Sequence, residues 1–158
     1  MPGDRDMKES FKVLVADSNR NVREFLRREL ALAGYEVVTS GNSRRLFTAI
    51  EKDGLLDLLV VDPEMPLLDE RTLCGLLDGR LPPLHMILYG YGEECRNRYS
   101  LPRGCTVVER GEDVDSLKEA VRRELMSCYP QRFSRWRSSA QGPPGSWCGT
   151  GSPKLRLP

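Results

Sequence analysis

The segment that most constrains this chain is a run of four apolar residues, Leu58–Val61, which ends in the carboxylate of Asp62. A short continuous apolar run is typical of a strand buried on both faces, as in a parallel sheet covered by helices. Pro63 and Pro66 follow at once, and prolines do not continue a central strand. Asp62 is therefore predicted to lie at the carboxyl end of a central strand, where open α/β sheets bind ligands.

Strand-like and helix-like segments alternate over about residues 11–128. The predicted strands cover residues 11–16, 35–39, 58–61, 85–89 and 105–108. Apolar residues at helical spacing predict a helix after each strand, and the weakest of these helices covers residues 93–99. This alternation predicts an α/β fold: a doubly wound, five-stranded parallel sheet of order 2-1-3-4-5 with helices on both faces.

The predicted strand order brings two carboxylates together. The switch point of such a sheet lies between strands 1 and 3, which end at Asp17 and Asp62. Mg²⁺ prefers oxygen ligands and is typically held by one or two carboxylates, and a carboxylate can attack phosphorus to form an aspartyl-phosphate. Each residue alone could simply cap the turn after its strand. Their joint occurrence favours a functional site.

The two ends of the chain differ from its middle. Residues 1–10 are polar and are predicted to be a disordered leader. From Tyr129 onward there are five basic residues and no acidic one, so the preceding 128 residues carry 19 basic and 23 acidic groups. Residues 129–158 contain Gly/Pro-rich stretches and few apolar residues, which predicts a disordered basic tail.

Several classes of protein are disfavoured by the sequence. There is no membrane-span-length apolar run and no secretory signal, so a cytoplasmic protein without membrane contact is expected. The five cysteines show no C-x-x-C spacing, which argues against a disulfide framework and against a zinc site. No glycine-rich turn follows the first strand, which argues against nucleotide or flavin binding. His85 lies in a predicted strand and is expected to be a core or strand-edge residue.

Two segments, Val13–Ser18 and Leu59–Pro66, resemble the receiver domain of two-component response regulators, which has a flavodoxin-like fold. The resemblance covers about residues 11–128, and its most specific part is the Asp-x-x-Met-Pro motif that begins at Asp62. The resemblance implies that Asp62 accepts a phosphoryl group. It also implies a Mg²⁺ ion held by Asp17, by Asp62 and by the backbone carbonyl of Glu64.

Other positions depart from the family pattern. The second acid after strand 1 is replaced by Ser18, which could still orient a metal-bound water. The family's Thr or Ser at the end of strand 4 corresponds to Leu88, or to Tyr89 if the register shifts by one residue. The aromatic switch position of strand 5 corresponds to Thr106. These switch positions are thus degenerate, while the phosphoacceptor is retained.

The family's Lys-Pro pair after strand 5 is replaced by Glu109 and Arg110. A glutamate near a phosphorylated aspartate would repel it unless a cation intervenes. Arg110 could supply that positive charge, but adjacent strand residues point to opposite faces. Such a rescue is therefore expected only if the strand ends or bulges before Arg110.

The sequence thus favours an atypical receiver domain of a phosphorelay, phosphorylated on Asp62 by a sensor histidine kinase or phosphotransfer protein and read by a downstream protein partner. It is not expected to be an enzyme or to bind specific nucleic acid, and homodimerisation stays open. One alternative is a pseudo-receiver, an interaction module independent of phosphorylation. A second alternative is an aspartyl-phosphate phosphohydrolase, which would need a second aspartate at the position of Glu64.

Overall fold

We describe residues 9–80, 84–91, 104–111, 113–139 and 142 of a computed structural model of the chain. The five strands form one parallel sheet of order β2-β1-β3-β4-β5, as predicted. The strands are β1 (Lys12–Ala16), β2 (Glu36–Ser40), β3 (Leu58–Val61), β4 (His85–Gly90) and β5 (Cys105–Glu109). Within the described part of the chain, no helix has the length and apolar character needed to span a membrane.

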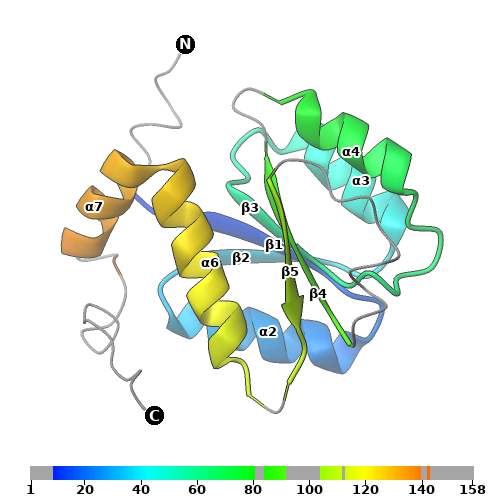
Figure 1. Cartoon of the computed structure of the whole chain (residues 1–158), viewed down its shortest axis with the longest axis horizontal. Helices are drawn as coiled ribbons and strands as arrows, with labels where there is room; N and C mark the ends of the chain where they lie inside the picture. Colours follow the sequence, from blue (N-terminus) through cyan, green and yellow to red (C-terminus); the bar gives the residue numbers. More distant parts are fainter. Residues whose placement is uncertain (1–8, 81–83, 92–103, 112, 140–141, 143–158) are drawn as a thin grey trace.

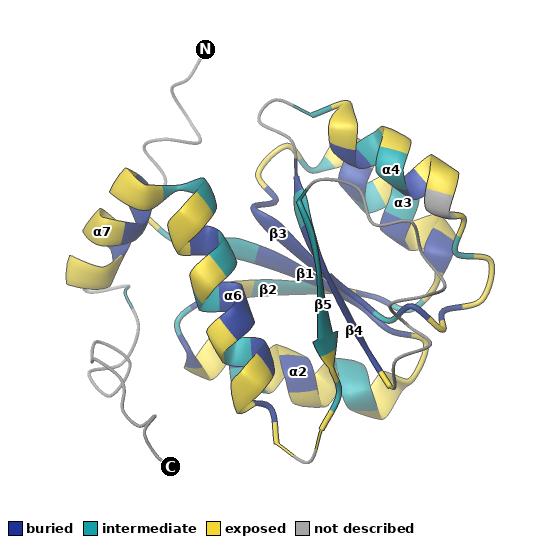
Figure 2. Cartoon of the chain, viewed as in Figure 1, coloured by how far each residue is buried: buried dark blue, intermediate teal, exposed yellow. Residues whose placement is uncertain are grey.

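Helices cover both faces of this sheet (Figure 1). On one face lie α2 (Arg20–Leu32) and α6 (Asp115–Cys128), and on the other lie α3 (Ser43–Lys52) and α4 (Glu70–Asp78). The central strand β3 is buried along its whole length, as its unbroken apolar run predicts (Figure 2). The predicted doubly wound fold is therefore confirmed.

The alternation of side chains along the strands divides the core into two clusters. Val13, Val15, Val60 and Ile87 pack on the α2 and α6 face. Residues one position away, such as Val61 and Leu88, pack on the α3 and α4 face instead. A residue's position in its strand therefore decides which face its side chain reaches.

The helix boundaries follow local capping chemistry. Asn19 caps α2, since its side chain accepts hydrogen bonds from the N–H groups of Asn21 and Val22. Helix α3 is capped by Asn42 rather than by Ser43, which is its first residue. Gly34 follows α2 with a φ of 100°, a conformation that favours glycine.

The region after Tyr129 differs from the prediction. Pro130–Ser138 form a helix, α7, in which Arg132, Phe133 and Trp136 are buried, so the expected disordered tail is wrong for this stretch. The apolar residues are few, but Trp136 stacks on Tyr35 with ring centroids 5.1 Å apart. A few large aromatic side chains can bury as much surface as many small ones. The remaining predicted tail is almost entirely outside the described residues, as are the predicted leader up to residue 8 and the predicted helix at 93–99.

Candidate functional site

Asp17 and Asp62 lie at the carboxyl ends of the neighbouring strands β1 and β3. The Asp62 N–H donates to the carbonyl of Ala16, with 2.9 Å between N and O, so the parallel ladder continues to the first residue of the site. Asp17 is buried, with 2% of its surface exposed, whereas Asp62 is partly exposed. The predicted meeting of two carboxylates at the switch point is thus what the fold produces.

The loop after β3 orients the Asp62 carboxylate. The Glu64 N–H donates to Asp62 Oδ1 at 2.9 Å. Met65 is buried in the α3 and α4 core cluster, and Ser43 Oγ donates to the Pro66 carbonyl at 2.6 Å. Met65 and Pro66 therefore attach the loop to the α3 and α4 side of the molecule. The Glu64 side chain is exposed to solvent.

Both carboxylate oxygens of Asp17 accept hydrogen bonds within the protein. Oδ1 accepts from the Asn19 N–H at 2.8 Å, and Oδ2 accepts from Arg110 Nη2 at 2.9 Å. The backbone of the same turn is held by Arg23, whose Nη1 donates to the carbonyls of Asp17 and Ser18. The Ser18 residue itself is exposed.

Arg110 reaches the acidic pair because regular strand alternation, rather than a bulge, turns its side chain to that face and the Glu109 side chain away. β5 ends at Glu109, and the Arg110 N–H donates to the Gly90 carbonyl. Val108 packs on the α2 and α6 face, so strand alternation puts Arg110 on that face too, beside Asp17. Glu109 is exposed instead. The positive charge thus comes from the second residue of the Glu-Arg pair.

The Arg110 guanidinium packs against groups of β4 and of Tyr91, the residue that follows this strand. It lies 4.7 Å from the ring centroid of Tyr89 and 5.3 Å from that of Tyr91, and Nη2 also donates to the Tyr89 carbonyl. Its Nε is buried and has no hydrogen-bond partner among the described residues. The site therefore holds a largely buried cation whose Nε donor is unused.

The register of β4 assigns the position at the end of the strand to Tyr89 rather than to Leu88. Val61 pairs with Leu88, and both side chains belong to the α3 and α4 cluster. Tyr89 packs on the opposite face, the one that holds Arg110. The first choice of Leu88 as a switch position is therefore wrong, because its side chain points away from the acidic pair.

Thr106, the second predicted switch position, lies away from the acidic pair. It is the second residue of β5, whose amino end is opposite to the sheet edge that carries Asp62. Its Oγ1 donates to Glu124 Oε1 at 2.7 Å, which ties β5 to α6. Thr106 thus contacts the last helix of the sheet domain and not the site.

The surroundings of Asp62 disfavour its ionised form. Burial raises the pKa of the Asp62 carboxyl above its ordinary value, and the negative charges of Asp17 and Glu64 act in the same direction. The Glu64 N–H and the Arg110 guanidinium oppose this rise. An added cation beside Asp62 would therefore favour the ionised state of this carboxyl group.

The oxygen atoms of this site are chemically suited to bind a hard divalent cation. Two carboxylates from neighbouring strands and a loop carbonyl are oxygen ligands of the kind that Mg²⁺ takes, usually together with waters. Asp17, Asp62 and the Glu64 carbonyl would hold the ion, and the exposed Ser18 would contact its water. Arg110 already neutralises Asp17, so it and a metal ion would compete for the same carboxylate.

Comparison with solved structures shows the same architecture. The response regulator protein TrrA from Thermotoga maritima, solved in complex with Mg²⁺-BeF, is 27% identical and matches with a TM-score of 0.65 over 72% of this chain and 98% of its own. The receiver domain of the hybrid histidine kinase CckA is 26% identical, with a TM-score of 0.60 over 72% and 98% of the two chains. In fold and in sequence, this chain is thus similar to receiver domains of response regulators.

Curated relatives of the chain are response regulators and a probable transcriptional regulator. Response regulator MprA of Mycobacterium tuberculosis is 40% identical over 70 residues, which are 44% of this chain and 30% of the relative. The probable transcriptional regulator ycf27 of Pyropia yezoensis is 32% identical over 84 residues, 53% and 34% of the two chains. The chain thus matches about a third of the length of these relatives. No family model matches it.

Sequence reasoning missed one residue of this candidate site and one unusual backbone conformation in the loop beside it. Arg23 holds the Asp17 turn, and an arginine six residues after a strand-end aspartate is the only signal that could have indicated it. Leu67 has a φ of 61° and is 91% exposed in the loop after Asp62. A left-handed leucine has no sequence signal, because the conformation is imposed by the anchored loop.

Proposed function

We propose that this receiver domain accepts a phosphoryl group on Asp62 in a phosphorelay. The observation that carries the proposal is the pairing of a partly exposed Asp62 with a buried Asp17 at the switch point of the sheet. The exposed residue is accessible to a phosphoryl donor, while the buried one is shielded. The donor would be a histidine kinase or a phosphotransfer protein, and the reaction would take place in the cytoplasm.

The chemistry assigned to Asp62 is nucleophilic attack. A carboxylate oxygen forms a bond to phosphorus, and the bond from phosphorus to the donor's histidine nitrogen breaks, leaving that nitrogen to take up a proton. The Glu64 N–H holds Oδ1, which orients the carboxylate for this attack. When bound, Mg²⁺ would neutralise the negative charge of the phosphoryl oxygens.

Arg110 would respond to the new charge. A phosphoryl group on Asp62 adds oxygen acceptors near a guanidinium that interacts electrostatically with Asp62 and has an unused Nε donor. A phosphoryl group carries roughly −1.5 to −2 charge, more than the Asp17 carboxylate, so Arg110 is expected to shift from Asp17 toward it. Tyr89 and Tyr91, which pack on Arg110, would move with it and change the surface that a protein partner reads.

Intact-mass measurement tests the proposal. The full chain is incubated with acetyl phosphate and Mg²⁺, and the mass should rise by one phosphoryl group. Asp62→Asn should abolish the gain, whereas Asp78→Asn, which changes an exposed aspartate at the end of α4, should retain it. Absence of an adduct in the wild-type chain with acetyl phosphate and with a panel of phosphorylated histidine donors would refute the proposal.

A second candidate function is a phosphorylation-independent interaction module. The observation that favours it is the Arg110–Asp17 ion pair, which neutralises the site without a metal or a phosphoryl group. In that case Asp62→Asn would leave binding to a protein partner unchanged. A change in partner affinity for a variant that remains folded would exclude this candidate.

A further inference from the structure

A second cluster of reactive side chains lies away from the acidic pair, at the opposite end of the sheet. His85, the only histidine of the chain, is the first residue of β4. Its Nδ1 lies 3.1 Å from Glu124 Oε2 and 3.1 Å from Cys128 Sγ, both on α6. Glu124 and Cys128 are four residues apart, so they share one face of the helix. The fold thus brings an imidazole, a carboxylate and a thiol together.

The neighbours of this cluster hold two of its members in place. Thr106 Oγ1 donates to Glu124 Oε1, which leaves Oε2 directed at the imidazole. Gly104 has a φ of +81°, and a Cβ there would lie 3.0 Å from His85 Cδ2, so glycine makes room for the ring. Outer contacts of this kind orient ligands at metal sites.

The spacing of the three atoms suits a tetrahedral metal ion. Zinc binds nitrogen at about 2.0–2.1 Å and thiolate sulfur at about 2.3 Å, which separates neighbouring tetrahedral ligands by roughly 3.5 Å. The three side chains offer one atom each, and all three atoms lie within 4.8 Å of one another. Only small side-chain movements would admit an ion. Imidazole, thiolate and carboxylate are all zinc ligands, whereas Mg²⁺ avoids sulfur.

We propose that His85, Glu124 and Cys128 form a binding site for Zn²⁺ or a similar thiophilic divalent ion, with a fourth position open to water. The spacing of the cysteines along the chain argued against a zinc site, because sequence rules detect ligands in close pairs. Here the three ligands come from β4 and α6, and the fold alone brings them together. The site joins the amino end of β4 to the end of α6, next to the start of α7.

Binding would exchange a proton for the metal. Burial and the charge of Glu124 raise the pKa of the Cys128 thiol to about 11, so the sulfur carries a proton at neutral pH in the metal-free protein. Formation of the sulfur–metal bond releases this proton to solvent. His85 would bind through the Nδ1 lone pair, with its ring proton on Nε2.

Cobalt titration of the full chain without an affinity tag tests the site. Co²⁺ replaces zinc in such sites, and a thiolate ligand gives it a charge-transfer absorption in the near ultraviolet. After treatment with a chelator, the wild-type chain should develop this absorption with one equivalent of Co²⁺, release about one proton, and lose the absorption when Zn²⁺ is added. Cys128→Ser should abolish the absorption, and His85→Gln or Glu124→Gln should weaken Co²⁺ binding at least tenfold.

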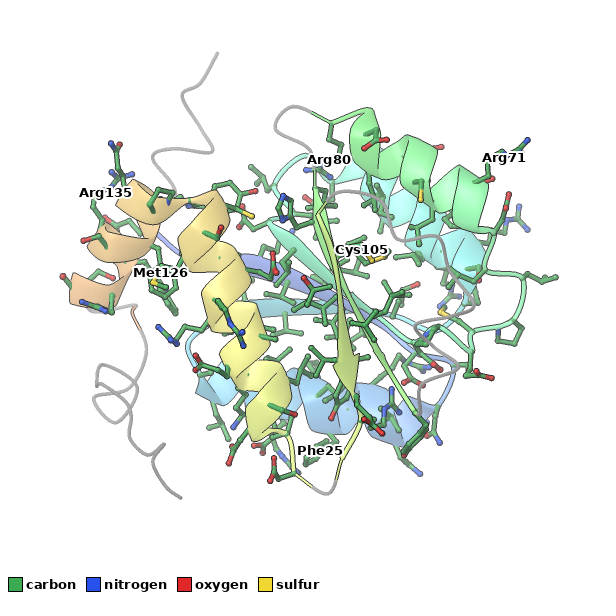
Figure 3. The ribbon with its side chains drawn as sticks, viewed as in Figure 1. Phe25, Arg71, Arg80, Cys105, Met126 and Arg135 are labelled. Atoms are coloured by element: carbon green, nitrogen blue, oxygen red, sulfur yellow. The ribbon has the colours of Figure 1, made fainter. Side chains whose placement is uncertain are left out.

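Matched controls separate this site from other metal binding. Cys105→Ser should retain the absorption, since Cys105 packs on the α3 and α4 face (Figure 3). Asp62→Asn should retain it too, because that carboxylate lies at the other end of the sheet. A readout without variants is alkylation: Zn²⁺ should protect Cys128, but not Cys105, from a thiol reagent.

Three results would overturn the zinc proposal. One is a wild-type chain that shows no thiolate absorption with Co²⁺ in millimolar excess. Another is absorption that persists in Cys128→Ser or disappears equally in Cys105→Ser. The third is equal alkylation of Cys128 with and without Zn²⁺.

Discussion

At the scale of single residues, Arg110 changes how the acidic pair works. Its guanidinium neutralises Asp17 and also touches the aromatic rings of Tyr89 and Tyr91. A side chain that is fixed by three groups of the site can sense a charge change at Asp62. Arg110 thus already provides part of the positive charge that a bound metal ion would supply.

Arg110→Met is expected to raise the affinity of the domain for Mg²⁺ about tenfold. The variant removes the competitor for Asp17 Oδ2, and a hydrogen bond to a charged group contributes roughly 1.5 kcal/mol or more. Calorimetric titration with Mg²⁺ measures the change. Arg71→Met removes the same charge from an exposed position on α4 (Figure 3) and should leave the affinity nearly unchanged. Equal effects of the two substitutions would contradict direct competition.

Asp62→Asn is expected to stabilise the metal-free domain at pH 7 by on the order of 1 kcal/mol, or a few degrees in melting temperature. The pKa of Asp62 is raised in the folded state, mainly by burial, so the folded protein holds this proton more tightly than the unfolded chain. Ionisation of Asp62 therefore costs stability at neutral pH, and this cost fades as the pH falls through the raised value toward the ordinary value of 3.8.

Thermal melts in the presence of a chelator at pH 7 and at pH 4 measure the stability difference between Asp62→Asn and the wild-type domain. The advantage of Asp62→Asn over the wild-type domain should shrink at the lower pH. Asp78→Asn, an exposed control, should change stability by less than about 0.5 kcal/mol. A variant that is less stable than wild type at pH 7 would show that ionised Asp62 stabilises the fold.

At the scale of elements, α7 is held to the sheet by a buried ion pair. Arg132 Nη1 and Nη2 donate to the two carboxylate oxygens of Asp57, each at 2.8 Å, and Nη2 also donates to the Ser10 carbonyl. Asp57 also accepts the Lys12 N–H, and the Arg132 guanidinium lies 4.2 Å from the centre of the Phe11 ring. The helix thus closes over the amino ends of β1 and β3.

Arg132→Met is expected to reduce the free energy of unfolding by about 3–5 kcal/mol. The substitution leaves the buried Asp57 carboxylate without its cation, and breaking one side of a buried pair costs that much. Urea unfolding measures the loss. Arg135→Met provides the control on the same helix, since Arg135 is exposed and projects away from the sheet (Figure 3), and it should cost less than about 0.5 kcal/mol. A loss below about 1 kcal/mol for Arg132→Met would mean that water compensates Asp57.

At the scale of the whole molecule, the unit that folds extends past α6 to α7. Phe133 and Trp136 belong to the same buried cluster as the β1 and α6 side chains. Figure 1 shows α7 beside α6, and α6 and α7 are joined at Tyr129, without an intervening loop. The receiver-like sheet and this helix therefore share one core.

Truncation is expected to distinguish a folded unit that ends at residue 128 from one that includes α7. A chain that ends at residue 142 should unfold with a melting temperature within a few degrees of the full chain. A chain that ends at Tyr129 should lose at least about 3–5 kcal/mol, the typical cost of deleting one large buried aromatic side chain, and Trp136 is only 1% exposed. Denaturation followed by circular dichroism measures both. Equal stability of the two truncated chains would restore the boundary at residue 128.

Much of the fold was predictable because its signals are local. The apolar run before Asp62, the helical spacing of apolar residues and the capping asparagine at residue 19 each depend on near neighbours in the chain. The helix at 130–138 was not predictable from composition, because its stability comes from Arg132 and Trp136 meeting partners about 75 and 100 residues away. The same holds for the contact of Arg110 with Asp17, which are 93 residues apart.

The sequence by itself determined the sheet, its strand order and the meeting of Asp17 with Asp62, since periodicity and chain connectivity are properties of the chain alone. Only the tertiary structure decided which member of the Glu109–Arg110 pair faces the acids, and that Tyr89 rather than Leu88 faces them too. It also brought His85 to Glu124 and Cys128. A shift of one residue in a strand reverses the face that a side chain reaches, and this register is set by packing between distant segments.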